Sequence, residues 1–313
     1  MSQYIKWFNE LGIEDVDLVG GKNASLGEMY QNLTQEGIRI PNGFAITADA
    51  YRIILDTNGA WEKLDAQFES FNPDDVIQLQ ERGKRCREII YDCTLSDDII
   101  EQISNAYEEL KVEYGEDVTL AVRSSATAED SPEASFAGQN DSYLNIGDLE
   151  ALLDAYKRCL ASNFTDRSIH YKFDHGFDYM KVYLSVVVMK MVRSDIGESG
   201  VMFSIDSETG FKDVVFINAA YGLGENIVQG SIAPDSFYVH KPTFKKGYRS
   251  VLKRRLGDKT LKMVFADEIN TDNIAVEYTK NIETPKEEQT RFCISDDDVL
   301  ILADDAIKIE DHY

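Results

Sequence analysis

Two cations occupy positions that suit phosphate binding. Lys22 follows Gly20 and Gly21 at the start of a predicted helix, where backbone amides, the positive end of the helix dipole and an ammonium group meet. Arg123 follows a β-type run over 118–122, and a guanidinium at a strand end can bind two phosphate oxygens at once. Lys22 and Arg123 are therefore the predicted catalytic, phosphate-handling residues. For Lys22, the alternative is a simple glycine turn followed by a solvated lysine.

The first cation does not belong to a Walker A loop. Val16 stands where that motif needs its first glycine, and Asn23 stands where it needs Ser or Thr. The helix that carries Lys22 is predicted from apolar residues at helical spacing, and Gly37 is its stop signal. Those apolar positions are Leu26, Met29, Tyr30 and Leu33.

The polar segment 121–140, AVRSSATAEDSPEASFAGQN, is too rich in small and acidic residues to bury much apolar surface. We predict a mobile surface loop after Arg123, of the kind that often closes over a ligand, although a loop without a function is the alternative. Gly138 and Gln139 form the step where a backbone can approach a ligand closely. Ser142, which begins the next predicted strand, 142–146, is included in the candidate site.

Several segments closely resemble the nucleotide-binding domain of the phosphoenolpyruvate synthase (pyruvate, water dikinase) family, a group that extends to pyruvate phosphate dikinase and rifamycin phosphotransferase. They read RSSATAED and PEASFAGQ over 123–139, GGKNASLGEM from Gly20, IPNGFAITADAY from Ile40 and SGVMFSID from Ser199. In that family the lysine after the glycine pair contacts the nucleotide phosphates, and the resemblance carries this role to Lys22.

Two further segments are assigned to the nucleotide. The apolar run 182–192 is predicted as a strand buried on both faces, and its end, Met189, Lys190 and Met191, resembles the hinge that lines adenine. The family usually has glutamine at position 189. The segment from Gly222 reads GLGE, but Ile227 replaces the last glycine of a dinucleotide fingerprint. The resemblance makes Glu225 a candidate ligand contact, with a structural turn as the alternative.

The remaining segments of the sequence are predicted mainly to have structural roles. Residues 61–114 are predicted to be helical, with a cap at Asn72-Pro73 and another at Ser96, and Thr47 is a predicted N-cap. The segment 241–262 holds nine basic residues and one acidic residue, which we interpret as a solvated face or, alternatively, a phosphate-facing or inter-domain surface. Ser295 and three aspartates are predicted to open a final helix.

The net charge of -24 disfavours general attraction to nucleic acid or anionic membranes. The four cysteines show neither paired nor metal-binding spacing, and no signal peptide or long apolar span is evident, so a reduced, cytoplasmic protein is predicted. The four histidines lack the small-residue setting of the family's phosphorylated histidine. We assign none of them a function.

Together, the sequence and the resemblance predict an α/β (α+β), ATP-grasp-like, two-lobed domain with a helical N-terminal portion. The approximate lobes are 1–188 and 189–313, with ATP and Mg²⁺ bound between them. The ending at Tyr313 is interpreted as a truncation. The resemblance implies that the domain continues into a strand with the metal-binding acidic pair, followed by domains that hold the phosphohistidine and the pyruvate site. This part alone is therefore expected to bind nucleotide poorly.

The intact enzyme implied by the resemblance transfers phosphate from ATP to its own histidine and then to pyruvate. Its products are phosphoenolpyruvate, AMP and phosphate. Two alternatives stay open from the sequence: the ATP domain of a rifamycin-type antibiotic phosphotransferase, and a nucleotide-binding module without transfer activity.

Overall fold

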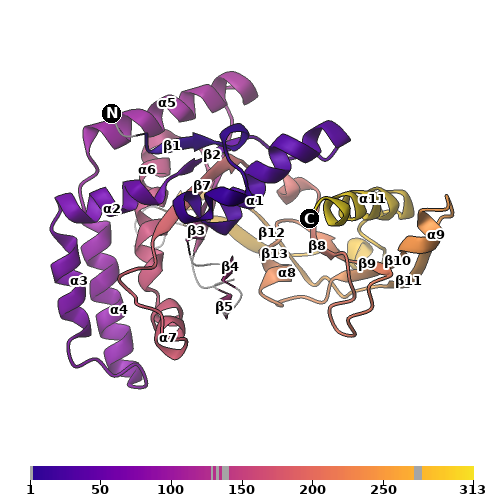
Figure 1. Ribbon diagram of the computed structural model, residues 1–313. Helices are drawn as coiled ribbons and strands as arrows, with labels where there is room; N and C mark the ends of the chain where they lie inside the picture. Colours follow the sequence, from indigo (N-terminus) through magenta and orange to yellow (C-terminus); the bar gives the residue numbers. More distant parts are fainter. Residues whose placement is uncertain (1–2, 128–129, 132–133, 136–140, 271–276) are drawn as a thin grey trace. The chain divides into compact units, whose positions relative to one another are not determined.

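The structure is a computed structural model that describes residues 3–127, 130–131, 134–135, 141–270 and 277–313 (Figure 1). The chain divides into two compact units, Met1–Met191 and Val192–Tyr313. Both units mix helices with antiparallel sheets, which agrees with the expected mixed α/β class. No helix in the described ranges is both long enough and apolar enough to cross a membrane.

The first unit is built on a five-stranded sheet with the order β1-β2-β7-β3-β6. Its strands are β1 (Ile5–Trp7), β2 (Gly43–Ile46), β3 (Leu120–Ala126), β6 (Ser142–Ile146) and β7 (Leu184–Lys190), with the two-residue β4 (Asp130–Ser131) and β5 (Ala134–Ser135) forming a separate ladder. Its helices are α1 (Val16–Leu33), α2 (Ala48–Thr57), α3 (Ala60–Phe68), α4 (Val76–Tyr91), α5 (Asp97–Tyr114), α6 (Leu149–Ala161) and α7 (Asp166–Asp174).

Strand β7 lies in the middle of this sheet, paired with β2 on one side and β3 on the other (Figure 1). Its central position explains the nearly continuous apolar run, because helices cover both of its faces. On one face, Val187 joins Val19 and Ala24 of α1 in a core cluster. On the other, the Cys159 thiol of α6 approaches the Val122 carbonyl of β3, with Sγ and O 3.7 Å apart.

The predicted helical stretch is present as α3, α4 and α5, but one of its caps was misplaced. Asp75, rather than Asn72, is the N-cap of α4, and its carboxylate accepts hydrogen bonds from the Ile77 and Gln78 amides. A carboxylate at this position also interacts favourably with the positive end of the helix dipole. The hydrogen bonds to Gln78 and Ile77 lower the pKa of Asp75. Ser96 and Thr47 occupy the predicted N-cap positions of α5 and α2.

The second unit places α11 against a four-stranded sheet with the order β11-β10-β9-β8 (Figure 1). The sheet strands are β8 (Glu198–Phe203), β9 (Val214–Tyr221), β10 (Asp235–His240) and β11 (Val251–Arg255), and β12 (Leu261–Asn270) and β13 (Glu277–Glu283) form a hairpin. The helices are α8 (Glu225–Val228), α9 (Lys241–Phe244), α10 (Lys286–Gln289) and α11 (Asp296–His312). Ser295 caps α11 with a capping box, as predicted.

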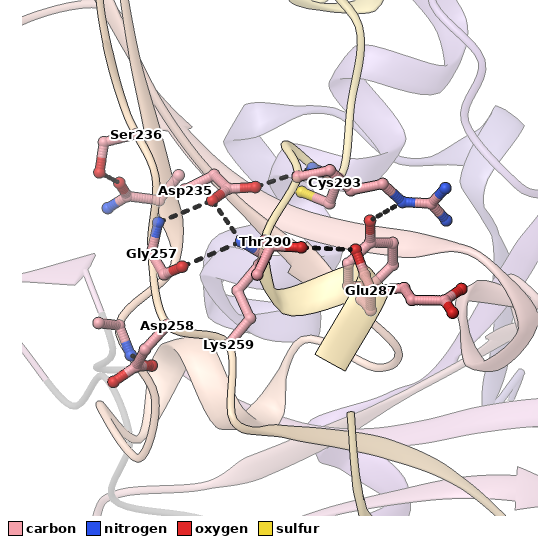
Figure 2. A network of polar contacts seen from close by, with 12 residues as sticks. Asp235, Ser236, Gly257, Asp258, Lys259, Glu287, Thr290 and Cys293 are labelled. Atoms are coloured by element: carbon pink, nitrogen blue, oxygen red, sulfur yellow. Dashed lines mark hydrogen bonds and ion pairs between the residues drawn. The ribbon is translucent and has the colours of Figure 1, made fainter. Parts of the chain in front are cut away.

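A buried ion pair organises the centre of the second unit (Figure 2). Asp235 and Lys259 are both fully buried, with Oδ1 and Nζ 2.6 Å apart. Asp235 also accepts hydrogen bonds from the Gly257 amide at 2.8 Å and the Cys293 amide at 2.8 Å. This one carboxylate therefore ties β10 to the segment before β12 and to the segment before α11.

Most of the basic side chains in the segment 241–262 are exposed, in agreement with the expected solvated face. Most of its cations pair with acidic side chains of the same unit, four of them on α11. The pairs are Lys241–Glu310, Lys245–Asp311, Arg249–Asp297, Arg254–Asp296, Lys259–Asp235 and Lys262–Glu288. The local charge reversal is thus largely compensated within the unit.

Candidate functional site

The helix start at Lys22 is created by a break in α1. Gly20 has φ 74° and ψ 163°, a conformation that interrupts the helix, so its second part begins at Gly21. The left-handed φ favours glycine, and an added Cβ at position 20 would lie 2.4 Å from Ser125 Oγ. The predicted Gly-Gly-Lys helix start is therefore confirmed, and it lies directly against β3.

Arg123 lies inside β3, which continues three residues beyond it to Ala126. The predicted loop after Arg123 was wrong for these residues, because the segment is paired with Leu184–Val187 of β7. Ser124 and Ser125 are 3% and 0% exposed, so they are strand residues within the packed interior and not loop hydroxyls. Arg123 itself is exposed.

Strand alternation puts Arg123 on the sheet face that α1 covers. Arg123 pairs with Val187, which packs against α1, and lies two residues from Ser125, whose hydroxyl oxygen is 3.4 Å from the Asn23 amide. Ser142 is the register partner of Arg123 in β6 and is exposed as well. The fold thus brings the Lys22 helix start, Arg123 and Ser142 to one face of one sheet.

Charges from three residues act on the buried Cys159 thiol of α6. Burial raises the pKa of this thiol and the charge of Asp141 adds to the rise, whereas the charges of Arg123 and Lys22 oppose it.

The segment expected to line adenine has its backbone amides already engaged. The Lys190 amide donates to the Asn42 carbonyl at 3.2 Å and the Met191 amide to the Thr119 carbonyl at 2.8 Å. Strand β7 is paired with β2 on one side and with β3 on the other, so an adenine contact here is left to side chains and carbonyl oxygens, and it stays a prediction. Met189 packs on the α1 core, and the Lys190 ammonium lies 4.4 Å from the Tyr114 ring centroid.

Glu225 belongs to the second unit, where it is the first residue of α8. Its Oε2 atom is buried and has no hydrogen-bond partner within the described part of the chain. Gly222, which precedes it, has φ 82° and comes so close to Met263 that an added Cβ would lie 2.5 Å from its carbonyl oxygen. The turn is therefore fixed by packing, and it presents a carboxylate oxygen without a partner.

Two predicted contacts, Gly138 and Gln139, lie outside the described residues. No group of three or more His, Cys, Asp or Glu side chains among the residues searched is arranged to hold a metal ion.

The prediction also missed three polar residues beneath the cations. Asn23, Ser125 and Ser185 are all fully buried. Ser185 gave a signal that was readable in the sequence, because it is the one polar residue between Leu184 and Met189 in an otherwise apolar run.

Comparison with known proteins finds one matching protein family and several similar proteins. Residues 16–313 match the family model described as pyruvate phosphate dikinase, AMP/ATP-binding domain. The chain is 52% identical over 312 residues to phosphoenolpyruvate synthase of Helicobacter pylori, covering 99% of this chain and 38% of that protein. It is 49% identical to the Synechocystis protein of that name, with 99% and 38% covered, and 44% identical to the Escherichia coli one, with 100% and 39% covered.

Proposed function

Because the chain belongs to the pyruvate phosphate dikinase AMP/ATP-binding domain family, and is thus an ATP-binding domain of the ATP-grasp-like type, we propose that it serves as the ATP-binding part of a phosphoenolpyruvate synthase. One observation carries the site assignment. The Lys22 helix start and the Arg123 strand meet at Ser125 on a single sheet face, and the Asn23 amide lies 3.4 Å from the Ser125 hydroxyl oxygen.

In this proposal Lys22 and Arg123 bind the phosphate tail of ATP. The ammonium and the helix start provide charge and backbone donors for one part of the tail, and the guanidinium can hold two oxygens of another. Phosphoryl transfer depends mainly on alignment and charge neutralisation, so each cation is worth roughly 2 to 4 kcal/mol in the transition state. Ser142, beside Arg123 in the ladder, supplies a further hydroxyl.

The remaining assignments extend from the phosphates to the rest of the nucleotide. We assign Gly138 and Gln139 to closure over the phosphates and Met189, Lys190 and Met191 to the adenine. With the amides of Lys190 and Met191 already bonded, their contribution comes from side chains and carbonyl oxygens. Glu225 is assigned to a contact with the ligand or its metal through its Oε2 atom, which has no hydrogen-bond partner among the described residues.

The ATP enters as its magnesium complex in this proposal. The residues described here do not contain a cluster that fits the ion, so no step is assigned to a metal ligand of this chain. What the chain's own residues do is neutralise and orient the phosphate oxygens.

The full reaction needs more protein than this chain. The chain spans less than two fifths of the length of the curated relatives named above. We propose that the rest of the full-length protein provides a swivelling domain, whose histidine takes a phosphoryl group from ATP, and a domain that binds pyruvate. Transfer to pyruvate then gives phosphoenolpyruvate, with AMP and phosphate as the other products, in the cytoplasm. The relatives' shared name favours this function over an antibiotic phosphotransferase.

The test is ATP-dependent phosphohistidine formation by the full-length protein carrying Arg123→Ala or Lys22→Ala. We expect each change to slow phosphorylation by about 30-fold or more, the equivalent of roughly 2 kcal/mol, with the melting temperature little changed. Arg52→Ala is the control, since Arg52 is a partly exposed first-unit arginine that pairs with Asp49 and whose guanidinium carbon lies 4.0 Å from the Tyr183 ring centroid. Near-normal phosphorylation by Arg123→Ala would remove Arg123 from the site.

A further inference from the structure

Three buried polar side chains join α1 to the two central strands under the candidate phosphate site. Ser125 of β3 and Ser185 of β7 are register partners, so their side chains lie next to each other on the α1 face. Asn23 contacts both: its Nδ2 donates to Ser185 Oγ at 2.9 Å, and its backbone amide donates to Ser125 Oγ at 3.4 Å. We call these three residues the Asn23 node.

The node also spans the break in α1. Asn23 Nδ2 donates a second hydrogen bond to the Val19 carbonyl at 3.0 Å. Val19 precedes the non-helical Gly20, and Asn23 follows it, so this side chain links the two parts of the interrupted helix. One residue therefore fixes the helix start both to the preceding turn and to the sheet.

Filling the interior with the three polar side chains of the Asn23 node costs folding free energy. All three residues are 0% exposed, and Asn23 Oδ1 has no hydrogen-bond partner in the described structure. A buried polar atom without a partner costs free energy, whereas apolar side chains of similar volume would pack at this place without that cost. The polar choice therefore points to a requirement for one defined geometry.

That geometry concerns the two cations. Lys22 directly precedes Asn23, and Arg123 lies two residues from Ser125 on the same face of β3. We propose that Asn23 is a positioning residue, which sets the placement of Lys22 relative to Arg123 by locking the helix start onto Ser125 and Ser185. This inference rests on the proposed phosphate site, and it assigns Asn23 no contact with the reacting atoms.

The main test compares two matched asparagines in the full-length protein. Asn163 is also 0% exposed, and its Nδ2 likewise donates to one backbone carbonyl, of Val182, and one hydroxyl, of Tyr51. Asn163→Ala also removes the side-chain oxygen that the buried Lys172 ammonium bonds, so it should lower the melting temperature at least as much as Asn23→Ala does. Only Asn23→Ala should lower kcat/KM for ATP, by about tenfold or more, with kcat falling as well, because misplaced phosphate contacts are lost in the transition state. An equal kcat/KM for both variants would overturn the proposal.

A second comparison remains decisive if Asn23→Ala does not fold. Ser125→Ala removes the acceptor of the Asn23 amide, whereas Ser124→Ala changes a neighbour, 3% exposed, whose hydroxyl bonds the Asp141 carbonyl at 3.4 Å on the other face. We expect a several-fold fall in kcat/KM for Ser125→Ala alone. Equal values for the two serine variants would contradict the node's role.

The double variant Lys22→Ala/Asn23→Ala separates positioning from mere structure. If Asn23 acts through Lys22, then Asn23→Ala should reduce kcat/KM clearly less in the Lys22→Ala background than in the parent. Full additivity would show that Asn23 works independently of Lys22. If Lys22→Ala and Arg123→Ala themselves leave activity normal, the proposed phosphate site fails first, which is distinguishable from a failure of Asn23 alone.

Discussion

At the scale of single residues, the candidate site depends on the absence of a Cβ atom at Gly20. Its positive φ starts a new helix in the middle of α1, and its missing Cβ lets the chain approach Ser125. Gly37 also has a positive φ, 93°, but an added Cβ there would meet nothing within 4 Å. A substitution at Gly37 therefore tests the effect of backbone strain alone, whereas one at Gly20 tests backbone strain together with a steric clash.

We expect Gly20→Ala to cost clearly more stability than Gly37→Ala. The exposed position should lose about 1 to 2 kcal/mol through the left-handed backbone alone. Position 20 adds a clash with the Ser125 side chain and backbone, and should weaken ATP binding as well. Urea unfolding and ATP titration of both variants measure this. Equal losses would mean that the contact with β3 relaxes easily.

At the scale of elements, a buried lysine joins α7 to the preceding turn. Lys172 is 0% exposed, and its ammonium nitrogen lies within hydrogen-bond distance of the Asn163 carbonyl and side-chain oxygens. Burial lowers the pKa of Lys172 to about 7, while the electrostatic interaction with Cys86 opposes this shift. The first-unit helices are thus held partly by a group that titrates near neutral pH.

This lysine should make stability depend on pH above neutrality. Between about pH 7 and its ordinary pKa of 10.5, the unfolded chain binds a proton at Lys172 that the folded chain does not. The free energy of unfolding should therefore rise with pH in this window, by up to about 1.4 kcal/mol per pH unit, and level off below it. Urea unfolding at several pH values, with Lys172→Met as reference, checks the slope. Parallel curves for the two proteins would show that Lys172 is charged when folded.

At the scale of the whole chain, charge is unevenly compensated. The net charge is -24, yet the basic segment 241–262 is largely paired with acidic groups in its own unit. Exposed ion pairs contribute little each, roughly 0 to 1 kcal/mol, whereas repulsion among excess carboxylates acts over the whole surface. Repulsion should therefore dominate the response to salt.

The melting temperature should rise by a few degrees when NaCl is increased from about 20 to about 300 mM, because salt screens the net repulsion. Arg254→Ala removes both a cation and its pair with Asp296 on α11, so its melting temperature should rise more steeply. Scanning calorimetry of both proteins provides the comparison. A falling melting temperature would mean that the ion pairs outweigh the repulsion.

Much of the candidate site was readable from local pattern. The Gly-Gly-Lys helix start, the strand that leads to Arg123, the buried strand β7 and the Ser295 cap follow from periodicity and capping chemistry, which involve residues close in the chain. The segments that matched a family did so for the same reason, since each is a continuous stretch. Local rules failed where small polar residues were taken for a loop, because RSSA at 123–126 has no apolar alternation to reveal a strand.

Only the tertiary structure decided which distant residues meet. Register placed Ser125 opposite Ser185, strand order put β7 between β2 and β3, and packing buried Asn23 above both serines. Likewise, packing brought α11 beside the basic segment, so that several of its cations pair with carboxylates of that helix. Such pairings depend on strand order and helix packing between segments that are far apart in the sequence, and a sequence pattern of period two or 3.6 carries no information about them.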